Sequence, residues 1–185
     1  MKVIKEIDEA CALLLAGEVI AYPTEAVYGL GCDAFNAKAV LHLLDLKKRP
    51  EEKGLIVLIA DWAQLSPLID MDKVPEARFE AVKKTWPGPV TWVFPKSKAV
   101  PNWITGTHAG VAIRMTAHPI ARALCQNGPI VSSSANVSGV SPARDLAVLS
   151  YLFPDGVAGV VAGDLGGNFA VSEIYNILDG SNLRN

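Results

Sequence analysis

The densest group of positive charges in the sequence lies between positions 38 and 53. Five of the chain's 17 lysine and arginine residues fall within these 16 positions, among them Lys47, Arg49 and Lys53, and Pro50 stiffens the segment. An arginine offers a planar pair of N–H donors that fits a phosphate group, and a lysine offers a point charge. The segment is therefore a candidate phosphate-binding loop. A solvated helix end, where cations complement the helix dipole, is the alternative interpretation.

A second polar segment follows an apolar stretch near position 130 and contains Ser132, Ser133, Ser134, Asn136 and Ser138. Small hydroxyl and amide groups beside exposed backbone N–H groups form concavities that bind anions. The chain contains neither the Gly-x-Ser-x-Gly turn of a serine hydrolase nor the Gly-Lys pair of a Walker loop. The competing interpretation is a serine-rich turn that caps its own backbone.

Thr24 follows an apolar strand expected at residues 19–22, which Pro23 ends. Polar groups at a strand end are where open α/β sheets bind ligands, so this position favours a binding role for Thr24. Gly29 and Gly31 follow in a partial match to the glycine fingerprint of dinucleotide-binding proteins, but six residues separate them from the strand. We therefore expect these glycines to form a tight turn rather than a dinucleotide site.

Isolated arginines supply all the lysine and arginine charge beyond Lys98. No lysine follows Lys98, and the basic residues beyond it are Arg114, Arg122, Arg144 and Arg184. Isolated arginines in an apolar region are typical of specific ion pairs or anion contacts. Arg114 ends an apolar strand, and Ser172 and Arg184 can return a hydroxyl and a cation to the same site. Because the histidines and cysteines lack metal-ligand spacing, a metal would have to arrive with a ligand.

The composition is that of one globular domain spanning residues 1–185. Half of the residues are hydrophobic, 19% are charged and the formal net charge is −2, so no global positive field attracts a polyanion. The three cysteines are far apart and odd in number, which favours a reducing cytoplasm. The sequence shows no signal peptide and no apolar run of about 18 residues, so we expect a cytoplasmic protein outside the membrane.

Hydrophobic periodicity predicts alternating helices and strands around these polar segments. Asn36 is expected to cap one helix, and Ser141 with Pro142 to begin the last helix. The alternation predicts an α/β or α+β fold with a twisted, mostly buried mixed sheet flanked by helices. Helices are expected at residues 7–15, 36–46, 62–69, 75–86, 119–126 and 142–153, and strands at 19–22, 55–59, 90–94, 111–115, 130–132, 157–161 and 174–178.

Taken together, these segments resemble the YrdC/Sua5 family of threonylcarbamoyl-AMP synthases in its short bacterial form. The similarity spans essentially the whole chain, and the order and spacing of the motifs make it specific. The matching motifs are Tyr22-Pro23-Thr24-Glu25-Ala26 with Gly29-Leu30-Gly31, Lys47-x-Arg49-Pro50-x-x-Lys53, Trp86-Pro87-Gly88-Pro89, Ala112-Ile113-Arg114 with His118-Pro119, Ser133-Ser134-Ala135-Asn136-x-Ser138-Gly139, and Ser172-Glu173-Ile174.

The resemblance implies a nucleotidyltransferase with a large, positively lined cleft. L-threonine, bicarbonate or CO2, and ATP would give threonylcarbamoyl-AMP and pyrophosphate, and separate tRNA threonylcarbamoyl-transfer proteins would use the adenylate. Mg²⁺ is expected on the ATP phosphates, with no ligands from the protein. By motif matching, the catalytic residues are Lys47 and Arg49, the ATP-binding residues are Arg49, Lys53, Ser134, Asn136, Arg144 and Arg184, and the threonine-binding residues are Thr24, Arg114 and Ser172.

Two other functions compete with this synthase. An RNA-binding module for tRNA or ribosome maturation would use the basic segment from Lys38 to Lys53, although the net charge of −2 argues against more than weak RNA binding. A paralogue that keeps the fold and takes another carbamoyl-type ligand is the third hypothesis. Turnover without RNA distinguishes the enzyme from the RNA-binding module.

Overall fold

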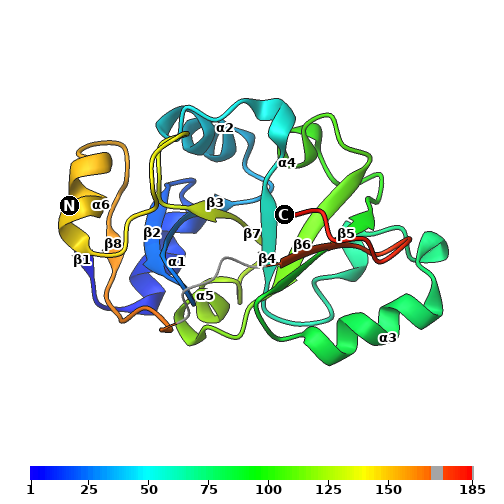
Figure 1. The fold of residues 1–185 in the computed structure, drawn as a ribbon. Helices are drawn as coiled ribbons and strands as arrows, with labels where there is room; N and C mark the ends of the chain where they lie inside the picture. Colours follow the sequence, from blue (N-terminus) through cyan, green and yellow to red (C-terminus); the bar gives the residue numbers. More distant parts are fainter. Residues whose placement is uncertain (168–172, 185) are drawn as a thin grey trace.

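The computed structural model describes residues 1–167 and 173–184, and within these ranges nine strands form one mixed sheet. The strand order is β1-β8-β2-β3-β7-β4-β6-β5-β9, with parallel and antiparallel neighbours (Figure 1). This confirms the predicted mixed α/β fold. The strands are β1 (Val3–Ile4), β2 (Ile20–Pro23), β3 (Tyr28–Asp33), β4 (Ile56–Ile59), β5 (Val90–Pro95), β6 (Gly110–Met115), β7 (Ile130–Ser134), β8 (Val160–Val161) and β9 (Glu173–Asn176).

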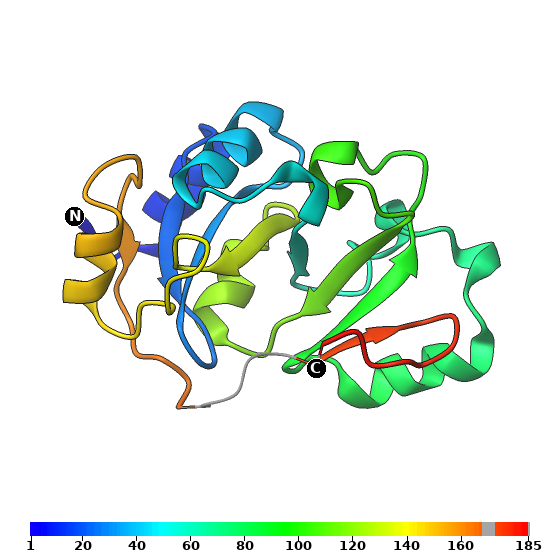
Figure 2. The ribbon, with the colours of Figure 1, turned by 45° about the horizontal axis from the view of Figure 1, so that its top comes forward.

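Helices cover both faces and the two ends of this sheet. In Figures 1 and 2, α6 lies at the edge beside β1 and β8, and α3 lies at the opposite end of the molecule. Within the described residues, no helix is long and apolar enough to cross a membrane. The α-helices are α1 (Ile7–Leu15), α2 (Ala37–Leu46), α3 (Glu76–Thr85), α4 (Asn102–Thr105), α5 (Pro119–Leu124) and α6 (Leu146–Leu152), and the 3₁₀ turns are η1 (Glu51–Lys53), η2 (Ser66–Leu68) and η3 (Met71–Lys73).

Alternating residues of the central strands enter two separate hydrophobic cores. In β4, Val57 and Ile59 pack into the larger core, which includes residues of α2, α3, α4 and α6. Leu58 points the other way, into a smaller core with residues of α1 and α5. Because successive side chains of a strand point to opposite faces, this pattern shows that each core lies on its own face of the sheet.

The segment with Gly29 and Gly31 is a central strand, so the predicted tight turn is wrong. Strand β3 pairs antiparallel with β2 on one side and β7 on the other. A Cβ atom at Gly31 would lie 2.8 Å from Cε1 of Tyr22 and 2.8 Å from the Val131 carbonyl oxygen. Position 31 must therefore be glycine because the Tyr22 ring lies against the backbone, a contact that local sequence patterns do not reveal.

Most of the other predicted elements are confirmed, with three corrections. The strand expected at residues 157–161 is only the two-residue β8 (Val160–Val161). The helix expected at residues 62–69 is only the short η2 turn within loops. The last helix starts later than expected, because Asp145 and not Ser141 caps it: the Asp145 carboxylate accepts a hydrogen bond from Val148 N at 2.8 Å. The backbone before Asp145 is hydrogen-bonded to other segments and does not join the helix, since Ala143 N donates to Ala135 O and Ala143 O accepts from Tyr28 N.

Asp145→Ala is expected to lower the free energy of unfolding by about 1 kcal/mol, the usual cost of losing a side-chain cap. Ser141→Ala, at the position that the sequence favoured, is the matched control and should change stability by less than about 0.5 kcal/mol. Urea denaturation followed by circular dichroism measures both. The reverse order of effects would show that Ser141 is the cap.

Candidate active site

A cleft of about 600 Å³ opens on the sheet face that α1 and α5 cover in part. In β6, Gly110, Ala112 and Arg114 line this cleft, whereas Val111 and Ile113 between them pack into the larger core. The strand alternation that builds the core therefore also aims Arg114 into the cleft. Residues of β5, β7, β9 and the loop after β2 complete the walls.

Three cations stand on the walls of the cleft: Arg49 and Lys53 from the loop after α2, and Arg184 from the C-terminal segment. The Arg49 side chain is tied to its own loop, since Nε and Nη2 donate to the Gly54 carbonyl at 3.1 and 2.8 Å. Burial lowers the pKa of Arg49, and the nearby positive charge of Arg184 lowers it further. Burial also lowers the pKa of Arg184, and there the positive charge of Arg114 adds to the effect. These cations repel one another across the cleft, and a polyanion between them would relieve that repulsion.

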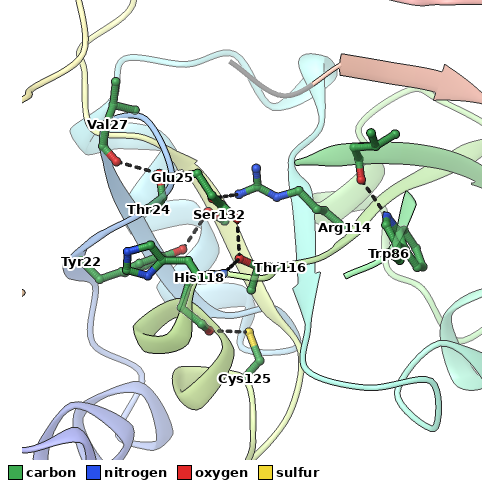
Figure 3. A network of polar contacts seen from close by, with 12 residues as sticks. Tyr22, Thr24, Glu25, Val27, Trp86, Arg114, Thr116, His118, Cys125 and Ser132 are labelled. Atoms are coloured by element: carbon green, nitrogen blue, oxygen red, sulfur yellow. Dashed lines mark hydrogen bonds and ion pairs between the residues drawn. The ribbon is translucent and has the colours of Figure 1, made fainter. Parts of the chain in front are cut away.

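A largely buried ion pair forms the floor of the cleft. Arg114 Nη2 lies 3.5 Å from Glu25 Oε2, and their side chains are only 11% and 12% exposed (Figure 3). Thr116 Oγ1 donates to Glu25 Oε1 at 2.9 Å. Burial raises the pKa of Glu25, but the Arg114 charge and the hydrogen bonds outweigh it, so the pKa lies below its usual range. The floor therefore carries one fixed positive and one fixed negative charge at neutral pH.

The serine segment at the end of β7 is held in place by Lys47. The buried Lys47 ammonium donates to the Ser134 carbonyl, to Asn136 O at 2.8 Å and to Asn136 Oδ1 at 3.3 Å. Burial, together with the nearby Arg49 charge, lowers the pKa of Lys47 to about 8. Ser134 Oγ donates to the same Asn136 Oδ1 at 2.6 Å. Lys47 thus joins the basic loop, which carries Arg49 and Lys53, to the serine segment from behind the cleft.

The structure brings together six of the residues that sequence analysis assigned to the site. Lys47 and Asn136 lie behind the cleft wall, and the exposed Arg144 is outside the lining residues. Ser172 falls outside the described residues. The six that line the cleft are Thr24, Arg49, Lys53, Arg114, Ser134 and Arg184.

Several polar residues of the site have no role predicted from the sequence. Glu25 is next to Thr24 in the first motif, and a carboxylate at a strand end is a signal that could have been used. Thr116 lies two residues after Arg114, so strand alternation aims it at the same face. His108 lines the cleft from the loop before β6, and nothing in its local sequence marks it.

Comparison with known proteins settles the family. A model of the Sua5, YciO and YrdC proteins, described as "Telomere recombination", matches residues 12–183. The chain belongs to the Sua5/YciO/YrdC family. The resemblance stated from the motifs is thereby confirmed.

Two bacterial threonylcarbamoyl-AMP synthases are similar to this chain over nearly its whole length. The threonylcarbamoyl-AMP synthase of Coxiella burnetii (strain RSA 493 / Nine Mile phase I) is 48% identical over 183 residues, which are 97% of each chain. That of Xanthomonas euvesicatoria pv. vesicatoria (strain 85-10) is 44% identical over 181 residues, again 97% of each. These names agree with the activity that the motif resemblance implies.

Solved structures of the family share the fold. The structure of P. abyssi Sua5 complexed with L-threonine is 33% identical, with a TM-score of 0.89 over 98% of this chain. This chain spans only 55% of that Sua5 chain. E. coli YciO, at 21% identity and a TM-score of 0.82, supports the fold alone.

The charged lining of the cleft is positive on balance. Among the lining residues that the structure describes, four are lysine or arginine and one, Glu25, is acidic. No group of three histidine, cysteine, aspartate or glutamate side chains that could hold a metal ion occurs in residues 1–167 and 173–184. The balance of charge suits an anionic ligand.

Lys47→Met is expected to lower the free energy of unfolding by about 1–3 kcal/mol, because it leaves buried carbonyl groups without their donor. The matched control is Lys48→Met, the same substitution at the exposed neighbouring position, which should change stability by less than about 0.5 kcal/mol. Urea denaturation gives both values. Equal effects of the two substitutions would show that the Lys47 ammonium does not hold the serine segment.

Proposed function

We propose that this protein is a threonylcarbamoyl-AMP synthase. The reaction joins L-threonine, bicarbonate or CO2, and ATP into threonylcarbamoyl-AMP with release of pyrophosphate. The observation that carries the proposal is the cleft itself, whose cationic walls and ion-paired floor fit a triphosphate and an amino acid. The 48% identity to the Coxiella burnetii protein of that name supports it.

The cations of the walls would bind the ATP phosphates. Arg49 supplies a planar guanidinium whose position is fixed by the Gly54 carbonyl, and the exposed Lys53 supplies a mobile point charge. Arg184 approaches from the C-terminal segment, where Leu183 N donates to Ile174 O at 2.7 Å. Ser134 would contact the nucleotide from the opposite wall, as the motif match implies.

L-threonine would bind near the floor. Arg114 carries the only positive charge of the β6 strand and can pair with the amino acid carboxylate. Thr24 Oγ1 donates to the Val27 carbonyl at 2.7 Å, so its oxygen lone pairs remain available as acceptors. The motif match assigns Ser172 to the same ligand. The L-threonine complex of P. abyssi Sua5 supports a threonine site in this fold.

Catalysis then depends on positioning and charge stabilisation. The amino group of threonine, once it has lost its ammonium proton, combines with CO2 and releases a second proton, or combines with bicarbonate and releases water, to give a carbamate. A carbamate oxygen attacks the α-phosphorus of ATP, a new P–O bond forms, and the bond to pyrophosphate breaks with the electron pair leaving on that group. Arg49, Lys53 and Arg184 offset the negative charge during this step, so no covalent enzyme intermediate is needed.

Mg²⁺ would enter with ATP. The only carboxylate among the described lining residues, Glu25, is engaged by Arg114 and Thr116, so the cleft offers a metal mainly hydroxyl groups. Magnesium commonly keeps several waters and binds substrate phosphates with few protein ligands. These residues therefore fit a cation that the triphosphate carries, whose role is to neutralise phosphate charge.

Lys47 and Asn136 act in this proposal as positioning residues. Lys47 donates to the backbone of Ser134 and Asn136, and Asn136 Oδ1 accepts from Ser134 Oγ, so the two residues would fix Ser134 and the basic loop relative to each other. Arg144 keeps the ATP-binding role that the motif match implies. It lies just before the Asp145 cap, on the exposed segment ahead of α6.

The wider setting follows from the chemistry of the product. We place the whole chain, residues 1–185, in one catalytic domain in the cytoplasm. Its adenylate would pass to separate tRNA threonylcarbamoyl-transfer proteins. Weak RNA contact through exposed lysines such as Lys38 and Lys48 remains a secondary prediction.

Pyrophosphate release tests the proposal. Purified protein with ATP, Mg²⁺ and bicarbonate should release pyrophosphate with L-threonine, and much less with L-serine or without an amino acid. Release without RNA would make the RNA-binding module unnecessary. Folded, ATP-binding protein that releases none would favour the paralogue with another carbamoyl-type ligand.

Arg49→Ala is expected to lower kcat/KM for pyrophosphate release by about 30- to 1,000-fold, which corresponds to about 2–4 kcal/mol for an oriented charge donor. Lys83→Ala is the control, because it removes the same charge from a side chain that is 51% exposed on α3, and it should stay within about twofold. A folded Arg49→Ala variant with near-normal turnover would exclude Arg49 from the reaction.

A further inference from the structure

The charge at the floor of the cleft differs from the charge on its walls. Arg49, Lys53 and Arg184 present positive charge, whereas Arg114 is accompanied by the Glu25 carboxylate at 3.5 Å. A bare cation at the floor would bind any small carboxylate. A buried cation and anion side by side instead match a ligand that carries both charges.

This ion pair keeps unused bonding capacity on both partners. Glu25 Oε2 accepts no hydrogen bond and Arg114 Nε donates none within the described part of the chain, although both atoms are buried. The 3.5 Å separation is also longer than a good N–H···O hydrogen bond. Buried polar atoms are nearly always satisfied, so these two are candidates for bonds to a ligand.

The Glu25 carboxylate is held ionised and in place. Its other oxygen, Oε1, accepts from Thr116 Oγ1 at 2.9 Å, and the backbone N–H of His118 donates to that same Thr116 oxygen at 3.1 Å. In Figure 3 the Glu25 and Arg114 side chains point toward each other above Thr116. Oε2, which faces Arg114, is thus the oxygen of this fixed carboxylate that accepts no hydrogen bond from the described residues.

We infer that Glu25 binds the α-ammonium group of the amino acid while Arg114 binds its α-carboxylate. This inference rests on the proposed function and assigns Glu25 a role in substrate specificity. A carboxylate ligand without an amino group would place its negative charge beside Glu25 and would have no ammonium group to bind the Glu25 carboxylate. The pair would therefore select against hydroxy acids and simple carboxylates.

Binding of two ligands tests the inference without catalysis. Isothermal titration of wild-type protein should show L-threonine binding at least about tenfold tighter than 3-hydroxybutanoate, which lacks the amino group. Glu25→Gln should weaken threonine binding by about tenfold or more and leave 3-hydroxybutanoate binding unchanged or improved. ATP binding should stay within about twofold.

A purely structural role for Glu25 predicts a different result. If the carboxylate only holds Arg114 in position, Glu25→Gln would weaken both ligands by the same factor, and that outcome overturns the inference. Glu25→Asp keeps the charge and should recover part of the preference for threonine. Glu76→Gln, which removes an exposed carboxylate on α3, is the control and should change neither affinity.

Two further outcomes separate this inference from the proposed function. Equal binding of both ligands to wild-type protein overturns the inference, even where the Glu25 variants fail to fold. Threonine-dependent pyrophosphate release in that case leaves the synthase intact. Wild-type protein that binds ATP but neither threonine nor 3-hydroxybutanoate, and releases no pyrophosphate, contradicts both.

Discussion

A buried ammonium group connects the two segments on which the site depends. Lys47 ends helix α2 and donates to the carbonyls of Ser134 and Asn136, while its own carbonyl accepts from Ser138 N at 2.9 Å. The basic loop and the serine segment are more than 80 positions apart in the chain, and the cleft needs both at a fixed separation. A buried ammonium group is stable only when its hydrogen bonds are made, so Lys47 tolerates little change in that separation.

The alternation of the strands explains how one sheet carries both a core and a site. In β6 the odd-numbered residues are apolar and buried, and the even-numbered residues line the cleft. The apolar side chains of β6 therefore fix the strand in the core on one face of the sheet, and Arg114 lines the cleft on the other face. Because Arg114 stands on a strand between β4 and β5, its position is defined by the sheet and not by a flexible loop.

Local signals in the sequence predicted the parts of the fold that local interactions determine. Asn36 caps α2 as expected, because its side chain accepts from Ala39 N only three residues away. The errors arise where contacts with other segments of the chain determine the local structure. Gly31 lies in a strand because β3 pairs with β2 and β7, and the Tyr22 ring requires a glycine there. Asp145 replaces Ser141 as a cap because the backbone of Ala143 is bound to Tyr28 and Ala135.

The same contrast between local and long-range determinants applies to the site. Motif order predicted which segments would lie together, and six of the assigned residues line one cleft. The pairing of Glu25 with Arg114 joins residues 89 positions apart and depends on the strand order of the sheet. No pattern within a short window contains that information. The position of Lys47 behind the wall was missed for the same reason, since charge alone does not tell a ligand contact from an internal bond.

The placement of the two chain ends has a practical consequence for handling the protein. Leu183 and Arg184 line the cleft, whereas Val3 pairs with Val160 at the far edge of the sheet (Figure 1). Any peptide fused directly after the C-terminal segment would start at the mouth of the cleft. An affinity tag or fluorescent reporter therefore belongs at the amino end, where it leaves access to the cleft open.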